Sequence, residues 1–226
     1  MDATRINLVI GKDNFDKLKS SYVAIIGLGG VGSYIAETLA RSGVGHLLLI
    51  DGDCVEKSNL NRQILALNST LGMFKAEVMK NRIKDINSDC KVDVINRVYN
   101  PGDFDLFFNN QINFIADAID SVNAKIDIIK NAKERNIEII SAMGTGNKLN
   151  PLDLEISDIS KTHTCPLARV VRTKLKKDGI TKGVKVVFSK EIPKKNDSET
   201  VGSLVFVPAT AGIIIASEIL KKIINY

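Results

Sequence analysis

The sequence has few of the residues that mark secreted, metal-stapled or membrane-spanning proteins. Its 226 residues include no tryptophan, and three cysteines: Cys54, Cys90 and Cys165. This odd number, without a Cys-x-x-Cys pair, argues against a disulfide framework and a structural zinc site. The longest apolar stretch, from Ala211 to Ile219, is too short to cross a bilayer. With no N-terminal secretory pattern either, the sequence predicts a cytoplasmic protein without membrane association.

Charge is unevenly distributed along the chain. The formal net charge is +5, from 31 Lys and Arg against 26 Asp and Glu. Basic residues are concentrated in one block in the C-terminal part of the chain. Such a block can be simply a solvated surface of the protein, and the alternative is contact with nucleic-acid phosphates. Aromatic residues make up 5% of the chain, and the block offers no evident base-stacking platform. The basic residues of the block, which runs from Lys161 to Lys195, include Arg169, Arg172, Lys174, Lys176, Lys177, Lys182, Lys185, Lys190 and Lys194.

The most informative stretch that is present is a glycine-rich segment over 27–32. It follows an apolar run at 22–26, which predicts a buried parallel strand, and it opens a helical pattern. Glycines allow a sharp turn and a close approach of phosphate, and the helix that follows offers free N–H groups to an anion. A second apolar run, 46–50, ends at Asp51, at the spacing from which a carboxylate reaches a ribose hydroxyl. We therefore expect nucleotide binding by Gly27, Gly29, Gly30, Gly32 and Asp51.

Strand and helix patterns alternate along the chain. They predict an α/β fold with a doubly wound, mainly parallel Rossmann-like sheet, helices on both faces and right-handed crossovers. Ligands of such sheets bind beyond the carboxyl ends of the strands, so the glycine loop, Asp51, Asp120 and 143–146 should meet in one crevice. We expect strands over 22–26, 46–50, 91–98, 113–116, 137–141, 154–159 and 184–188. Helices are expected as a pair over 1–20 and over 74–86, 121–135 and 166–177, and the segment 202–208 should lead into a final helix that ends at about 224. A mobile loop is expected over 194–199.

Three charged residues favour a triphosphate over a nicotinamide dinucleotide. Arg62 and Lys75 fall where a loop and a helix start should meet the crevice, and two cations suit a triphosphate. Asp120 closes a strand and could hold Mg²⁺ on phosphate oxygens. Alternatives remain for each: Arg62 as a surface ion-pair partner, Lys75 as a solvated helix residue, and Asp120 as the N-cap of the following helix. Asp117 is expected to be structural.

These residues together resemble the ATP-dependent adenylyltransferase superfamily, which includes the ubiquitin-activating enzymes. The motifs are Gly-x-Gly-Gly-Val-Gly, Asp51, the segment 58–63 (Ser-Asn-Leu-Asn-Arg-Gln), Lys75 and the pair Asp117 and Asp120. The resemblance implies a ThiF-like, ATP-binding domain spanning 1–226, with a nucleotide-binding core over 21–145 and a substrate-facing extension with a terminal helix over 150–226. It implies the following roles: Asp51 on the ribose, Asn61, Arg62 and Lys75 on phosphates, Asp120 on Mg²⁺, and Arg5 reaching the partner's ATP site in a homodimer.

Segments 141–151, 161–172 and 202–208 narrow the resemblance to the tRNA threonylcarbamoyladenosine dehydratase branch. That branch implies adenylation of the threonyl carboxylate of a modified adenosine in tRNA, followed by ring closure that releases AMP. Ring closure within one molecule requires no enzyme nucleophile. We expect Arg169 and Arg172 to contact the tRNA backbone, with Lys161 and His163 as further candidates for tRNA or substrate. A sulfur-relay accessory protein is a further partner to consider.

Other interpretations of the sequence stay open. The chain could activate a ubiquitin-like sulfur-carrier protein by adenylating its C-terminus, or it could be a nucleotide-binding regulator without turnover. The absence of two Cys-x-x-Cys pairs speaks against the first of these. Cys165 is the candidate nucleophile if a covalent step exists, since cations nearby would favour a thiolate, and the alternative is a structural thiol.

Overall fold

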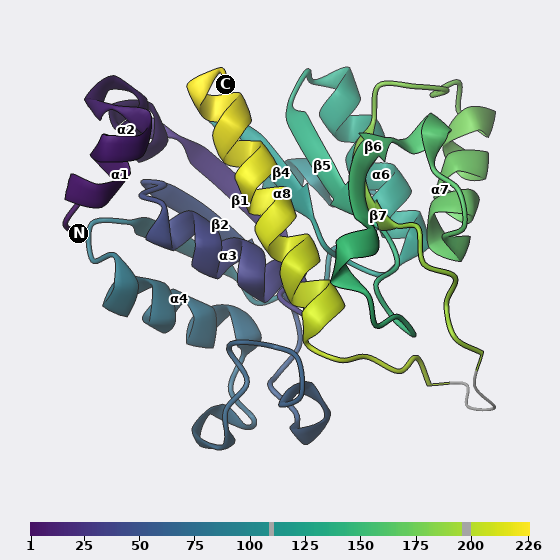
Figure 1. Cartoon of the computed structure of the whole chain (residues 1–226), viewed down its shortest axis with the longest axis horizontal. Coiled ribbons are helices and arrows are strands. Elements are labelled where there is room, and N and C mark those ends of the chain that lie inside the picture. Colours follow the sequence, from purple (N-terminus) through teal and green to yellow (C-terminus); the bar gives the residue numbers. More distant parts are fainter. Residues whose placement is uncertain (109–110, 196–199) are drawn as a thin grey trace.

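A computed structural model describes residues 1–108, 111–195 and 200–226. Its centre is a 7-stranded sheet with the order β3-β2-β1-β4-β5-β7-β6 (Figure 1). All neighbouring strands run parallel except β6, which pairs antiparallel with β7. The strands are β1 (Tyr22–Ile26), β2 (His46–Ile50), β3 (Lys91–Ile95), β4 (Phe114–Asp117), β5 (Glu138–Ala142), β6 (Leu154–Asp158) and β7 (Lys185–Ser189).

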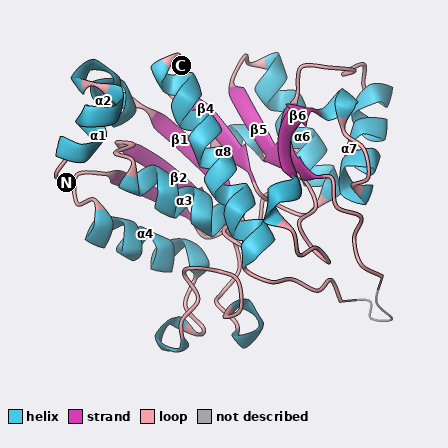
Figure 2. Cartoon of the chain, in the orientation of Figure 1, coloured by secondary structure: helices cyan, strands magenta, loops and turns pink. Residues whose placement is uncertain are grey.

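Helices cover both faces of this sheet (Figure 2). Side chains of α3, α4 and α8 form one core with Val23 and Ile25 of β1, and side chains of α5, α6 and α7 form the other core with Ala24 and Ile26. Because both faces are buried, the central strands are continuously apolar. The helices are α1 (Thr4–Ile10), α2 (Lys12–Ser20), α3 (Gly32–Arg41), α4 (Lys75–Ile86), α5 (Phe104–Phe107), α6 (Val122–Glu134), α7 (Pro166–Lys177) and α8 (Phe206–Ile224).

The C-terminal part of the chain continues the same sheet. Strand β7 pairs with β5, and β6 adds the last strand at that edge. Helix α8 then returns across the face covered by α3 and packs on α3 and α2 (Figure 1). The residues predicted to form an extension therefore share one sheet with the residues predicted to form the core.

The expected fold class is confirmed, with differences at element ends. Strand β3 ends at Ile95, whereas alternation predicted a strand to 98, because the chain bends at Arg97. The sequence pattern missed the short helix α5. The connector after β2 contains two 3-10 turns, Lys57–Asn59 and Asn68–Thr70. Part of the loop expected over 194–199 lies outside the described residues. Every helix within the described ranges is too short or too polar to pass through a membrane.

Candidate nucleotide-binding site

A cavity of about 670 Å³ lies at the carboxyl ends of the central strands. The expected convergence on one crevice is confirmed, because the glycine loop, the end of β2, the end of β4 and the loop after β5 all contribute to its wall. The lining includes Gly27, Gly29, Gly30, Asp51, Asp53, Asn59, Arg62, Gln63, Lys75, Arg97, Asp120, Ser121, Gly144, Gly146, Leu167, Val201 and Ser203.

Two glycines make the tight turn after β1. Gly27 has φ +83°, and a Cβ there would lie 2.9 Å from the carbonyl oxygen of Ala118. A Cβ on Gly32 would lie 1.7 Å from the carbonyl oxygen of Gly27, so Gly32 supports the turn from behind the cavity wall. No side chain of the described residues caps the N-terminus of α3 by a hydrogen bond. The N–H groups of Ser33, Tyr34 and Ile35 already donate to the carbonyls of Gly29 and Val31. What suits a phosphate here is therefore the positive end of the helix together with the backbone N–H groups of the glycine loop before it.

Asp51 braces the glycine loop from the end of β2. Its Oδ2 accepts a hydrogen bond of 2.6 Å from the Leu28 N–H, and its Oδ1 accepts one of 2.8 Å from the Asp53 N–H. Burial raises the pKa of Asp51, and the charge of Lys75 offsets part of this effect. Each carboxylate oxygen retains acceptor capacity, so the position fits the expected ribose contact.

The connector after β2 carries Arg62 to the glycine loop. A Cβ on Gly30 would lie 3.4 Å from Cγ of Arg62. The Arg62 Nη1 donates to the Ser58 carbonyl at 2.7 Å and to Oδ1 of Asn61 at 2.9 Å. No acidic side chain of the described residues lies within ion-pair distance of Arg62, so the described structure does not support the surface ion-pair alternative. Asn61 itself is exposed and lies outside the lining, where its Nδ2 donates to the Ser203 carbonyl at 2.8 Å.

Lys75 is the first residue of α4 and has a fixed position. It is 5% exposed, so the solvated-helix alternative is wrong. Its Nζ forms an ion pair of 2.7 Å with Oδ2 of Asp53, whose own side chain is 64% exposed. Asp53 is not among the site residues predicted from the sequence. Its position two residues after Asp51, just beyond the end of β2, was the available signal for a role in this site. The cavity thus has a buried cation with a carboxylate that is accessible to solvent.

Asp120 is exposed at the cavity wall and fits a single-carboxylate Mg²⁺ site. Ser121 is the N-cap residue of α6, so the capping alternative for Asp120 is wrong. Among the described residues no group of three or more His, Cys, Asp or Glu side chains could hold a metal. Mg²⁺ at a nucleotide site commonly takes only one or two carboxylates from the protein and its other oxygens from phosphates.

A buried ion pair supports the same edge of the sheet. Lys125 and Asp117 are both fully buried, with Nζ and Oδ2 2.7 Å apart. The Nζ also donates to Oγ of Ser141 at 3.1 Å and to the Ala142 carbonyl at 3.0 Å. The network ties together the ends of β4 and β5, directly before the two loops that enter the cavity. The expected structural role of Asp117 agrees with this position.

Gln63 carries an unused acceptor in the lining. The residue is 5% exposed, and its buried Oε1 has no hydrogen-bond partner in the described chain. A Cβ on Gly29 would lie 3.9 Å from its Nε2, so the amide stands beside the glycine loop. A buried polar atom without a partner costs free energy unless a ligand or water satisfies it. The residues present therefore fit a bound nucleotide.

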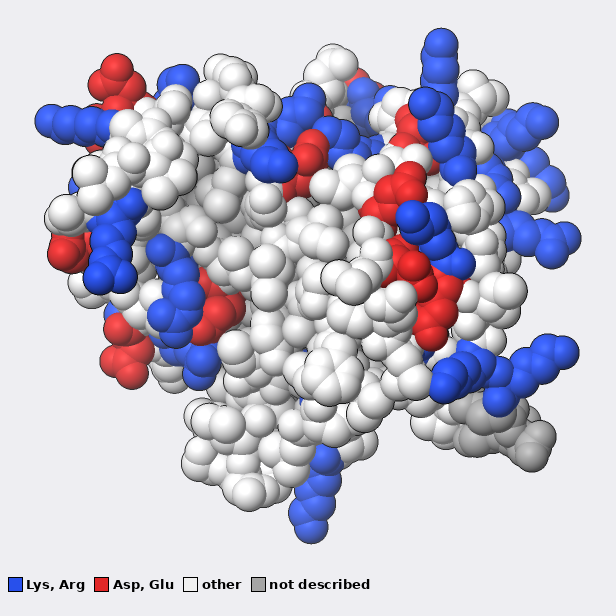
Figure 3. All heavy atoms as spheres, in the orientation of Figure 1, with Lys and Arg blue, Asp and Glu red and all other residues white. Residues whose placement is uncertain are grey.

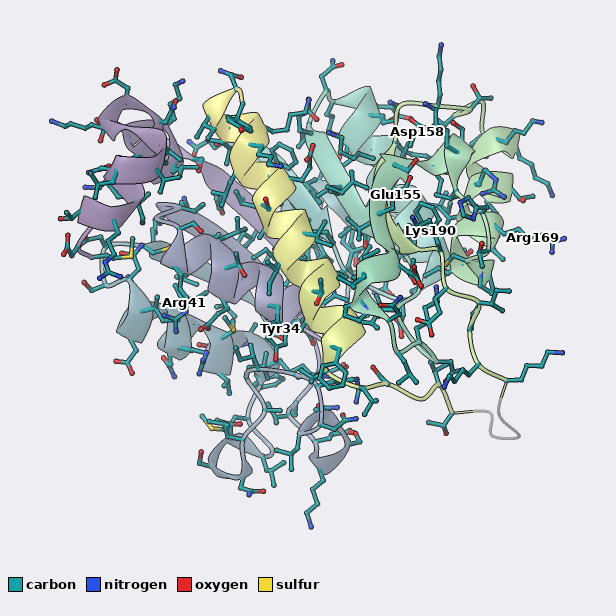
Figure 4. The ribbon with its side chains drawn as sticks, viewed as in Figure 1. Tyr34, Arg41, Glu155, Asp158, Arg169 and Lys190 are labelled. Carbon is teal, nitrogen blue, oxygen red and sulfur yellow. The ribbon has the colours of Figure 1, made fainter. Side chains whose placement is uncertain are left out.

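The remaining predicted site residues lie outside the cavity lining. Arg5 is exposed on α1. Lys161 and His163 are exposed in the segment before α7, and Arg169 and Arg172 are on α7. Basic side chains project over the α7 side of the molecule (Figure 3). Two members of the basic block are paired instead: Lys185 with Glu218, and Lys190 with Glu155 at 3.6 Å (Figure 4).

The sheet order, the glycine turn and the cations beside the N-terminus of α3 define a Rossmann-like nucleotide-binding protein. The model of the ThiF family matches residues 3–226, and the chain belongs to that family. The resemblance inferred from the sequence is thereby confirmed.

Similar proteins include tRNA-modifying enzymes. The chain is 43% identical to the tRNA threonylcarbamoyladenosine dehydratase of Bacillus subtilis, over 98% of this chain and 94% of that protein. It is 34% identical to the Escherichia coli enzyme of the same name, over 94% and 89% of the two chains. A crystal structure of the Escherichia coli enzyme with ATP has a TM-score of 0.93 at 35% identity, covering 98% of this chain and 93% of that one. A yeast adenylyltransferase and sulfurtransferase matches 66% of this chain at 33% identity.

Proposed function

We propose that this protein is an ATP-dependent tRNA threonylcarbamoyladenosine dehydratase. The observation that carries the proposal is the pairing of a phosphate cradle with near full-length similarity to dehydratases, over both the core and the extension. ATP is a substrate of this reaction. The threonyl carboxylate of the modified adenosine attacks the α-phosphorus, and pyrophosphate leaves.

Ring closure then follows within the activated substrate. The carbamoyl group attacks the activated carbonyl and loses a proton, and AMP leaves with one oxygen of the former carboxylate. The sum is loss of water driven by ATP. The gain in effective molarity makes an enzyme nucleophile unnecessary.

The chain's own residues bind and orient the nucleotide. Gly27–Gly32 and the N-terminus of α3 receive phosphates, and Asp51 accepts from the ribose. Arg62 and Lys75 stabilise the charge that develops on the phosphates, and Asp120 holds Mg²⁺. For this, Lys75 must share its ammonium between Asp53 and the phosphate. Asn61, which is outside the lining, supports Arg62 through its Oδ1.

The tRNA is proposed to lie over α7 and the segment before it. Lys161, His163 and Arg169 are exposed there, and backbone phosphates require cations rather than a specific pocket. A homodimer is part of the proposal, with Arg5 directed at the partner's ATP site. Leu8 and Val9 on the same short helix are 82% and 84% exposed, which favours burial against a second copy.

The deciding experiment is mass spectrometry of the anticodon-loop nucleoside from cells that lack the protein. The unclosed nucleoside, heavier by one water, is expected to accumulate, and the wild-type gene should restore the closed form. In vitro, pyrophosphate release should depend on threonylcarbamoyl-modified tRNA. If a small protein with a Gly-Gly C-terminus stimulates release and the modified tRNA does not, the chain is a sulfur-carrier activator instead.

A further inference from the structure

Arg169 and Arg172 share one helix but differ in their surroundings. Arg169 is exposed and points away from the body of the protein (Figure 4). Its guanidinium has no polar partner among the residues that the structure describes. Arg172 is half-buried, and its Nη1 donates to the carbonyl oxygen of Thr162 at 2.8 Å and to the Thr162 Oγ1 at 2.5 Å. The two arginines therefore have different roles.

The residue that Arg172 holds is itself fixed. Thr162 is 5% exposed, and its Oγ1 donates to the Ile159 carbonyl at 2.7 Å. Three residues further on, Cys165 is the N-cap residue of α7. Arg172, from the second turn of the helix, thus anchors the start of the segment 162–165 that leads into the same helix.

This segment has a strained backbone. Thr164 has φ +63°, which a β-branched residue rarely adopts. The chain folds back so tightly that the Cys165 N–H donates to the His163 carbonyl at 2.5 Å. The His163 ring packs edge-on against Phe188, with centroids 5.2 Å apart. A conformation of this kind persists only where surrounding contacts impose it, and the hydrogen bonds from Arg172 are among those contacts.

The segment borders the nucleotide cavity. Cys165 is 3% exposed, and its Sγ lies 3.4 Å from the position of a Cβ on Gly144, a lining residue. Leu167, in the first turn of α7, also lines the cavity. The conformation of 162–165 therefore determines the positions of the lining residues at the α7 side of the cavity.

We infer that Arg172 is a positioning residue, which clamps the segment 162–165 through Thr162 and so sets the cavity wall formed by Gly144 and Leu167. It is not a tRNA phosphate contact. Without the clamp, Thr164 relaxes from positive φ, and Cys165 and the first turn of α7 move off Gly144. The residues around the phosphates lie on other elements and keep their places. The catalytic consequence rests on the proposed function, whereas the clamp itself does not.

The first test measures the clamp without activity. In Arg172→Ala, modification of Cys165 by a thiol reagent, followed by peptide mass spectrometry, should be at least about tenfold faster than in the wild type, because the segment opens locally. Arg169→Ala is the matched control and should leave Cys165 protected. Thr162→Val removes one acceptor of the same contact and should give a smaller increase, about threefold. Unchanged labelling in both Arg172→Ala and Thr162→Val overturns the inference.

The second test measures turnover. In Arg172→Ala, kcat for tRNA dehydration should fall by about tenfold or more, while the Kd for ATP stays within about twofold and the salt dependence of tRNA binding keeps its slope. Adding Thr164→Gly should restore most of the loss, because glycine adopts positive φ without strain. A loss confined to KM for tRNA with a shallower salt slope would make Arg172 a phosphate contact. If the wild type dehydrates no tRNA, the proposed function fails, and the labelling experiment still decides the clamp.

Discussion

The nucleotide-binding core over 21–145 and the extension over 150–226 use charge in different ways. In the core, Lys75 and Lys125 are 5% and 0% exposed and each is paired with a carboxylate. In the extension, most cations are exposed to solvent, and several of them lie on α7 (Figure 3). Buried, paired charges fix a geometry, whereas exposed ones adapt to a large and variable partner. The difference is what the proposed function requires, a site for a small nucleotide beside a surface for tRNA.

The largest effect should follow from removing a charge in the core. Lys125→Met leaves the Asp117 carboxylate buried without its partner, which should lower the free energy of unfolding by about 3–5 kcal/mol. Lys174→Met, in the extension, is the matched control. Its Nζ is hydrogen-bonded to Asn123 at 2.7 Å on an exposed surface, so its removal should cost less than about 0.5 kcal/mol. Urea unfolding followed by circular dichroism measures both.

A double variant tests whether the unpaired charge is the cause. Asp117→Asn combined with Lys125→Met removes both charges and should be more stable than Lys125→Met alone. Equal losses in Lys125→Met and Lys174→Met would contradict the proposed contrast between the two regions.

The next effect is on chemistry within the core. Lys75→Ala and Arg62→Ala should each lower pyrophosphate release with modified tRNA by about 10²–10³-fold, since each removes a cation from the developing charge. Thermal unfolding should show that both variants fold. Pyrophosphate release at the wild-type rate in both would remove the triphosphate assignment, and the comparison of regions would lose its chemical meaning.

Much of the core was predictable because its signals are local. The apolar runs at 22–26 and 46–50, the glycine spacing and Asp51 lie within one βαβ unit, and the structure brings them together as expected. Asp53 was not predicted as the partner of Lys75, because that pair joins residues 22 positions apart across a connector of 3-10 turns. No periodicity encodes such a contact.

The extension was less predictable for a related reason. Spacing on a helix placed Arg169 and Arg172 close together, since i and i+3 are neighbours. It could not show that one of them turns back to Thr162, ten positions earlier, since this depends on how the segment before α7 folds. The helix was predictable from its own pattern, whereas the roles of its charged residues depend on tertiary contacts.

The smallest effect should come from Cys165, which tests whether the extension supplies chemistry. Its thiol is buried against Gly144, and the proposed ring closure needs no enzyme nucleophile, so Cys165→Ser should keep turnover within about threefold of the wild type. Cys90→Ser, at a fully buried thiol in the core, is the control for the cost of a buried hydroxyl. Complete loss of dehydration in Cys165→Ser with normal pyrophosphate release would indicate a thioester intermediate. The extension would then take part in the chemistry as well as in substrate binding.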